Sequence, residues 1–393
     1  MPTIFSNSTI ITPTETLSNA ALVAGDDGKI QYVGSMKNMP RVEGRRIHLN
    51  NRILIPGLID VHVHGGNGIN MGVAGVSPEE FKDEMNSYSD WAAEGGVTGF
   101  LAGILMPDRE SMTNLVSDYA DLFDEGLSGA EGLGIFLEGP FMNVAQKGAI
   151  KPPYLRHPDM DEAQGYIDAG RGWVRQIAMA PELPGAEEVA SLFRKAGVVV
   201  AFGHSDTDYD GARRALEGNW THITHTFNKH RGLHHREPGA VGAILTSEEI
   251  TAELIADSMH VHPAVMKILV RSIGVDRVVL ITDATALAGK PDGDYEVMGL
   301  TIHVRNGLAK IPAGNIAGST VTLNRCVRNM VQDVGVSLED AVRMATINPA
   351  RAMGFSQSLG SLEVGKDASL AVIDKDVNVY LTMVQGRIVY NNL

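Results

Sequence analysis

The sequence contains little cysteine, little positive charge and no long apolar run, and each shortage excludes a class of protein. Cys326 is the only cysteine, so no disulfide can form within the chain, as is typical of a reducing compartment such as the cytoplasm. Lysine and arginine number 33 against 47 aspartates and glutamates, a formal net charge of -14, whereas nucleic-acid binding requires a basic surface. No apolar run approaches about 18 residues, the length that spans a membrane. We therefore expect a cytoplasmic globular protein that binds neither nucleic acid nor membrane.

The middle of the chain alternates short apolar runs with longer amphipathic stretches. Eight runs rich in Val, Ile, Leu, Ala and Phe follow one another, from PGLIDVHV at residues 56–63 to DRVVLITDA at residues 276–284. The amphipathic stretch after Ser77 has Glu80 three places later, a pattern that begins helices. Because continuous apolar strands that alternate with helices form parallel sheets covered on both faces, the pattern predicts an α/β fold. Eight such units predict a closed (β/α)8 TIM-like barrel over residues 56–355.

The two ends of the chain differ from the middle. Residues 1–55 and residues 356–393 contain short runs, such as KIQYVG and VNVYLTMVQ, that are separated by Gly, Asn and Asp turns. We interpret them as the two halves of one small β-sandwich domain, formed by both termini beside the barrel. The alternative is two unrelated terminal extensions.

Polar side chains stand at the ends of the apolar runs, and the carboxyl ends of barrel strands share the face that carries the active site. His62 and His64 are two residues apart, so on a strand they point to the same side. Histidine nitrogens and carboxylate oxygens are the ligands that suit zinc and similar divalent ions. The sequence therefore predicts a metal site with the candidate ligands Glu138, His204, His225, His62 and His64, and with His260 and Asp283 nearby.

Each of these residues also has an ordinary structural explanation. A single histidine at a strand end is more often a hydrogen-bonded loop residue, a single glutamate is usually an ion-pair partner, and Asp283 can cap a following helix. The recurrence of such residues at the ends of different strands favours the metal site. His222 stands three residues before His225, so strand alternation predicts that it points away from the ligands and is structural.

Several short motifs occur in order between about residue 54 and residue 375. They are GLIDVHVHGG, FLEGPF, KGA, GHSDT, THTFN, HHREPGAVGA, IADSMHVHP, LITDA and IAGST. Together they resemble the N-acetylglucosamine-6-phosphate deacetylase family of the amidohydrolase superfamily, which includes N-acetylgalactosamine-6-phosphate deacetylase relatives. The resemblance implies a barrel with a flanking β-sandwich, a divalent metal and a homodimer.

The resemblance also implies a role for each matching residue. One metal is held by Glu138, His204 and His225. Some members have a second metal at the positions of His62 and His64, so one or two ions per subunit are expected, zinc first and iron, manganese, cobalt or nickel as alternatives. Asp283 is the implied general acid/base. The implied phosphate ligands are Asn228, His260 and Arg236, the last of these reaching the active site of the partner subunit. His235, next to Arg236, is a further candidate for substrate binding, and the alternative for it is a loop residue.

The chain departs from the family pattern in the substrate shell. Ile150 stands where relatives have a histidine that polarises the scissile carbonyl, and an aliphatic side chain cannot donate a hydrogen bond. Lys229 and His230 replace an Ala-Met pair, and Ser258 replaces a glycine. Either Lys229 or His230 supplies the missing donor or a new anion contact, or the two are solvated loop residues. His260 or a loop donor is then expected to help the metal stabilise the oxyanion.

The combined hypothesis is metal-dependent hydrolysis of the acetamide of an N-acetylhexosamine 6-phosphate, either the gluco or the galacto sugar. A bound divalent ion lowers the pKa of water from about 16 to about 7, which provides a metal-bound hydroxide nucleophile at neutral pH. Asp283 is expected to take up the water proton and deliver it to the leaving nitrogen. Two alternatives remain: an amidohydrolase that acts on a different phosphorylated or acidic N-acyl or N-glycosyl amine, and a non-catalytic scaffold on the same fold.

Overall fold

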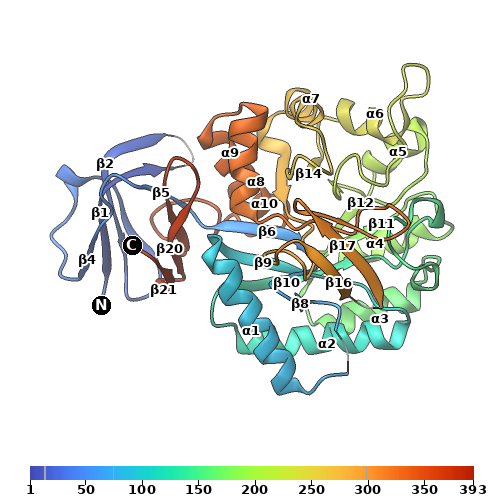
Figure 1. Cartoon of the computed structure of the whole chain (residues 1–393), viewed down its shortest axis with the longest axis horizontal. Coiled ribbons are helices and arrows are strands. Elements are labelled where there is room, and N and C mark those ends of the chain that lie inside the picture. The colour runs from blue at the N-terminus through green and yellow to red at the C-terminus, as the bar shows by residue number, and fades with distance from the viewer. Residues whose placement is uncertain (13–14, 74, 298) are drawn as a thin grey trace.

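The computed structural model describes residues 1–12, 15–73, 75–297 and 299–393. It consists of a large barrel and a smaller β unit at one end, and this smaller unit contains both chain termini (Figure 1). The predicted fold class, a (β/α)8 barrel with a small sandwich-like domain from both termini, is therefore confirmed.

The barrel is one sheet of eight parallel strands in the order β15-β14-β13-β12-β11-β10-β9-β6. Each apolar run of the sequence forms one of them: β6 (Leu58–Val63), β9 (Val97–Ile104), β10 (Glu131–Glu138), β11 (Val174–Met179), β12 (Val199–Phe202), β13 (His222–Ile223), β14 (Thr251–Ile255) and β15 (Val278–Ile281). The two end strands meet just beyond β15, where the Asp283 amide donates to the His62 carbonyl over 2.9 Å and the His64 amide to that of Ala284 over 2.8 Å. These two bonds draw the barrel closed at its carboxyl end.

Helices cover the outside of the barrel and bury their apolar faces against the strands. The first of them begins as predicted, because the Ser77 side chain accepts a hydrogen bond from the Glu80 amide over 3.2 Å. The helices are α1 (Pro78–Glu94), α2 (Arg109–Glu125), α3 (Met160–Gly170), α4 (Ala186–Lys195), α5 (Tyr209–Leu216), α6 (Gly239–Thr246), α7 (Pro263–Ile273), α8 (Leu323–Asn329), α9 (Leu338–Met344) and α10 (Ile347–Ala352).

The smaller unit is a sheet in the order β21-β20-β19-β5-β1-β2-β3, with β4 paired to β1. Its strands are β1 (Thr3–Ile11), β2 (Thr16–Ala24), β3 (Ile30–Ser35), β4 (Arg45–His48), β5 (Ile53–Pro56), β19 (Leu370–Ile373), β20 (Val379–Val384) and β21 (Arg387–Asn391). Strand β19 pairs antiparallel with β5, and the unit has its own apolar core around Phe5, Leu54 and Leu381. The termini are thus halves of one unit rather than unrelated extensions. We retain 1–55, 56–355 and 356–393 as proposed limits of the parts.

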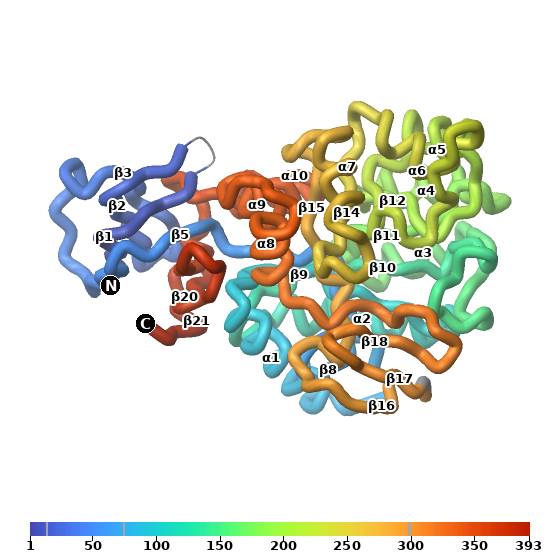
Figure 2. The backbone as a smooth tube through the Cα atoms, turned by 45° about the horizontal axis from the view of Figure 1, so that its top comes forward, coloured from blue at the N-terminus to red at the C-terminus, as the bar shows by residue number. Residues whose placement is uncertain are grey.

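A small antiparallel sheet that the sequence did not predict follows β15. It consists of β16 (Gly293–Val297), β17 (Leu300–Arg305) and β18 (Leu308–Lys310), and it projects from the barrel next to β8 (Figure 2). Strand β8 (Ile69–Asn70) pairs in turn with β7 (Gly65–Gly66). Ile302, Val304 and Ala309 pack with Leu287 and Ala317 in a separate apolar cluster. This cluster attaches the small sheet to one side of the barrel mouth.

In the part of the chain that the structure describes, no helix combines the length and apolar character that crossing a membrane requires.

A buried hydrogen-bond pair also joins the two end strands of the barrel. The Thr282 hydroxyl donates to Asp60 Oδ2 over 2.6 Å, and the Thr282 amide lies 3.2 Å from Asp60 Oδ1. Burial raises the pKa of Asp60 to about 6, against the opposing effect of these hydrogen bonds.

We expect Thr282→Val to lower the midpoint of thermal unfolding by several degrees. The substitution keeps the side-chain shape but removes a donor from a buried carboxyl, which costs about 1–3 kcal/mol. Thr98→Val is the matched control, because the Thr98 hydroxyl only reaches the Leu58 carbonyl over 3.4 Å. Equal losses in the two variants, measured by calorimetry, would show that the Asp60 contact adds nothing specific.

Candidate metal centre

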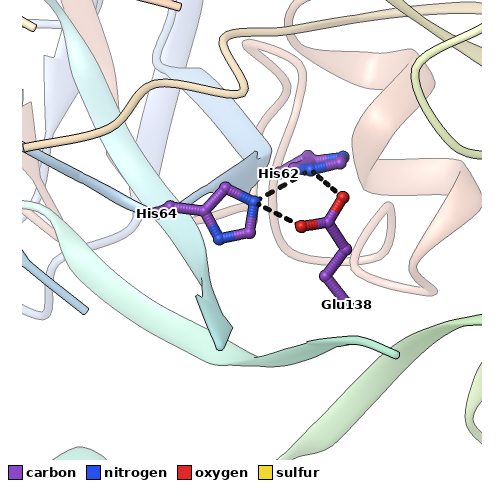
Figure 3. Close-up of side chains that lie close together, drawn as sticks. All are labelled: His62, His64 and Glu138. Carbon is purple, nitrogen blue, oxygen red and sulfur yellow. Dashed lines mark hydrogen bonds and ion pairs between the residues drawn. The ribbon is translucent and has the colours of Figure 1, made fainter. Parts of the chain in front are cut away.

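Glu138, at the end of β10, lies between two pairs of histidines. Its Oε2 is 3.1 Å from His64 Nε2, and its Oε1 is 3.7 Å from His62 Nε2 (Figure 3). The same Oε1 is 3.4 Å from His204 Nε2 and 3.2 Å from His225 Nε2. We call Glu138, His204 and His225 the first site, and His62, His64 and Glu138 the second site; in each, the donor atoms lie within 4.8 Å of one another. One carboxylate therefore serves two candidate metal positions.

Backbone conformation turns these side chains toward the barrel axis. His204, His225 and Asp283 have φ angles of 48°, 25° and 48°, and each lies two residues beyond the end of its strand, β12, β13 or β15. A positive φ is unfavourable for residues other than glycine and is concentrated at functional sites. Strand β13 is only two residues long, so His225 lies beyond its end. The conformational cost is thus incurred where the ligands must converge.

The second ring nitrogen of most ligand histidines is held by a protein acceptor. Nδ1 of His64 lies 2.8 Å from the Gly103 carbonyl, and Nδ1 of His204 lies 2.8 Å from the Gln146 carbonyl. A carbonyl only accepts, so these nitrogens carry the proton, and the neutral ring keeps a lone pair on Nε2. Lone pairs that converge on a carboxylate fit a divalent cation, and this arrangement of the outer nitrogens is usual for metal-ligating histidines.

Glu253, in the middle of β14, holds the ring of His62. Its Oε2 is 2.7 Å from His62 Nδ1, and its carboxylate is fully buried. Sequence reasoning missed this residue, although an acidic residue inside the apolar run AELIA was a visible signal. His222 also lies inside the barrel, with Nε2 3.1 Å from Glu253 Oε1, rather than pointing away as strand alternation predicts. It belongs to neither site.

The charges of the cluster depend on one another. Burial alone lowers the pKa of His62, but Glu253, Asp283 and Glu138 outweigh it and raise this pKa to about 10. Burial opposes the charged form of His64 in the same way, and the neighbouring Glu138 reverses the effect and raises its pKa. Burial raises the pKa of Glu138, yet the surrounding histidines hold it well below its ordinary value. Without a bound cation, protons therefore take up the positive charge that this cluster requires.

Asp283 lies beside the second site, with Oδ1 3.5 Å from both His62 Nε2 and His64 Nε2. It does not cap a helix, since the next elements along the described chain are the strands β16–β18. Its side chain remains slightly exposed and lines the cavity above the cluster. A carboxylate at this point can exchange protons with a molecule in the cavity.

A cavity of about 510 Å³ opens above the metal ligands, a size that suits a small molecule. Beside Asp283 and several of the ligands, the lining includes four residues of the predicted substrate shell: Asn228, Lys229, His260 and Ile150. The lining also includes Val297 and Ile302 of the small sheet. His260 is fixed there by Asp257, whose Oδ2 lies 2.6 Å from its Nδ1. Burial works against a charged His260, but Asp257 outweighs it and raises the pKa of His260.

Other predicted residues lie outside this cavity. His235 and Arg236 lie in an exposed loop, where Arg236 Nη1 is 3.0 Å from His235 Nε2. His230 is buried, its ring centre 6.2 Å from that of His225, and it is not among the residues that line the cavity. It is therefore not placed to contact a substrate directly. Ser258 donates to Asp333 over 2.8 Å.

Comparisons with known proteins agree with this geometry. The model of a family described as the amidohydrolase family matches residues 53–389. An N-acetylglucosamine-6-phosphate deacetylase of Vibrio furnissii is 35% identical over 373 residues, which cover 95% of this chain and 91% of that protein. An N-acetylgalactosamine-6-phosphate deacetylase of Escherichia coli is 35% identical over 336 residues, 86% of this chain and 87% of that protein.

A solved structure is similar over the whole length. It is a variant of N-acetyl-D-glucosamine-6-phosphate deacetylase from Mycobacterium smegmatis in complex with N-acetyl-D-glucosamine-6-phosphate, with a TM-score of 0.89 at 33% identity, covering 100% of this chain and 99% of that chain. The chain therefore belongs to the amidohydrolase family, whose members are metal-dependent hydrolases of amide bonds. Within that family its place is among the N-acetylglucosamine-6-phosphate deacetylases and their N-acetylgalactosamine-6-phosphate relatives.

Metal binding at the second site should release protons and strengthen as pH rises. The pKa of His62 is about 10 in the metal-free protein, so at neutral pH a cation that takes its Nε2 must displace a proton. The affinity should therefore increase about tenfold per pH unit for each proton released, between about pH 6 and pH 8. Titration calorimetry in buffers of different ionisation enthalpy counts these protons. An affinity that stays constant over this range would contradict the expectation.

Proposed function

We propose that the protein hydrolyses the acetamide of an N-acetylhexosamine 6-phosphate, N-acetylglucosamine 6-phosphate or N-acetylgalactosamine 6-phosphate, to acetate and the amino-sugar phosphate. The observation that carries the proposal is the Glu138 carboxylate shared by two histidine pairs, with Asp283 beside them at the cavity. The named activities of the relatives support the substrate class.

The proposed resident metal is zinc, since two histidine nitrogens and one carboxylate oxygen are typical zinc ligands. Glu138, His204 and His225 would hold the first ion, and His62 and His64 a second, so that each subunit holds one or two ions. Iron, manganese, cobalt and nickel accept the same ligands. Such an ion polarises a carbonyl and lowers the pKa of bound water to about 7.

Asp283 is the proposed general acid/base. Its carboxylate lies at the cavity, 3.5 Å from His62 Nε2 and His64 Nε2, and a substrate bound in the cavity beside the metal centre would lie next to it. As a base it removes the proton from water, and as an acid it delivers that proton to the nitrogen as the C–N bond breaks.

The remaining residues of the cavity would bind the sugar phosphate. His260 favours its charged form next to Asp257, which suits an anionic oxygen of the substrate or of the transition state. Asn228 and Lys229 line the same cavity. Arg236 and His235 are exposed and do not line it, so we propose that a homodimer places them at the active site of the partner subunit. The cytoplasmic location remains a prediction from the low cysteine content.

Ile150 and Lys229 support a second candidate function. Both line the cavity, where Ile150 offers no hydrogen bond and Lys229 adds a positive charge. The same metal centre can then act on a different phosphorylated or acidic N-acyl or N-glycosyl amine. A non-catalytic scaffold is the weakest candidate, because every proposed ligand and Asp283 are present and converge.

The deciding experiment measures acetate release by the metal-loaded protein from a panel of N-acylhexosamine 6-phosphates. We expect release from the gluco or the galacto compound, and we expect Asp283→Asn to lower kcat by about 10²- to 10⁴-fold through loss of proton transfer. Asp83→Asn, on the exposed face of α1, is the control and should keep full activity. No acetate from either sugar would end the substrate proposal, and turnover of another amide in the panel would favour the second candidate.

A second substitution tests the substrate shell. Ile150→His should raise kcat on an N-acetylhexosamine 6-phosphate by about 10²-fold, the contribution of one donor to a developing oxyanion. Ile150→Leu has no donor and serves as the matched control. If both variants have the same kcat, Ile150 does not face the scissile carbonyl.

A further inference from the structure

The carboxylate of Glu253 lies one layer below the metal ligands, at full burial inside the barrel. Its Oε2 is 2.7 Å from His62 Nδ1, 3.0 Å from the Thr224 hydroxyl and 3.0 Å from the His225 amide. Its Oε1 is 2.8 Å from Gln176 Nε2 and 3.1 Å from His222 Nε2. An ionised carboxylate only accepts hydrogen bonds, so all of these neighbours donate to it. This network replaces the water that a buried charge loses.

The contact with His62 distinguishes the second site from the first. His64 and His204 are oriented by backbone carbonyls, which the fold supplies whatever the side chain. His62 is oriented by a side chain instead, and an anionic acceptor makes the opposite ring nitrogen a stronger ligand than a neutral acceptor does. The Nδ1 proton of His62 is directed to Glu253, which leaves Nε2 facing His64 and Glu138.

We infer that Glu253 is the positioning residue of the second metal site, and that its carboxylate at His62 decides whether the protein holds one divalent ion or two. The inference rests on the proposed function in one respect, that Glu138 and the four histidines around it bind divalent ions. Glu253 contacts neither the cavity nor the proposed substrate, so it acts through His62. Among the residues that the structure describes, no acidic side chain contacts the outer ring nitrogen of His204 or His225, and Glu253 touches the first site at the backbone amide of His225.

The isosteric variant Glu253→Gln is the direct test. The amide oxygen can still accept hydrogen bonds from His62, Thr224 and the His225 amide. The new amide nitrogen can donate to Gln176 after a flip of that side chain, and to His222 after a change of tautomer. The fold should therefore be kept. The negative charge that Glu253 places against His62 Nδ1 is lost. We expect affinity for the second zinc equivalent to weaken by about 10- to 100-fold, the usual effect of losing an outer partner of a ligand. Affinity for the first equivalent should change much less.

A paired substitution separates the contact from the buried charge. Glu253→Gln together with Gln176→Glu returns one carboxylate to the network, but no longer against His62. If Glu253 acts by contact, this double variant remains deficient in the second ion while its thermal stability recovers. Glu162→Gln is the control for loss of a buried carboxylate elsewhere, since Glu162 binds Arg156 over 2.8 Å. It should lower stability and leave zinc stoichiometry unchanged.

The measurement is equilibrium dialysis of the full-length proteins against buffered free zinc, followed by metal analysis, with thermal unfolding of the metal-free forms in parallel. Wild type should take up two equivalents, and Glu253→Gln should take up one at the same free zinc. Two equivalents of unchanged affinity in that variant, or equal weakening of both, would overturn the inference. So would a single equivalent in wild type at every zinc concentration. A wild type that binds no zinc, or any other divalent ion of the set, would instead end the proposed function.

Discussion

The candidate metal centre depends on the carboxylate of Glu138, which both metal sites share. Glu138 brings two pairs of imidazole nitrogens to within 3.1–3.7 Å of its oxygens, and these nitrogens crowd one another at 3.0–3.2 Å. Lone pairs at such separations repel unless a proton or a cation lies between them. The barrel tolerates this crowding because the ligands come from the carboxyl ends of four parallel strands, with His62 and His64 both from β6, and the hydrogen bonds of the sheet hold these strands in place. The positive φ angles of His204 and His225 add a conformational cost to bringing these ligands together.

Sequence reasoning reached the barrel and its ligands for a simple physical reason. The strand ends of a (β/α)8 barrel share one face, so polar residues that end apolar runs must meet there, and Glu138, His204 and His225 do. It did not reach the sheet β16–β18, whose apolar positions pack locally against Leu287 and not into the barrel core. It misplaced His222, because alternation holds only along a regular strand and the chain turns at His225. Arg236 is exposed in this chain, and its contact with a partner subunit stays a proposal.

The substrate shell and the metal shell follow different rules in this protein. Three of the four ligand histidines, His62, His64 and His204, have their outer ring nitrogen fixed by a carboxylate or a carbonyl, so these ligands change little without losing the ion. Ile150 and Lys229 line the cavity and are not among the metal ligands. They can differ from relatives at little cost to the centre. Reaction type and substrate choice are therefore separable properties of the same cavity.

The connection between the two units has a consequence for engineering. Strand β5 of the smaller unit is followed by the single residue Gly57 and then by β6, which carries His62, and a Cβ at Gly57 would lie 2.1 Å from the Thr98 side chain. Strand β19 from the far end of the chain pairs with β5 and holds it in place. The smaller unit thus anchors the strand that delivers the metal-binding pair. A shortened protein that consisted of the barrel alone would lose the contacts that hold the N-terminal end of β6. The terminal sheet therefore has to be retained in any shortened catalyst built on this scaffold.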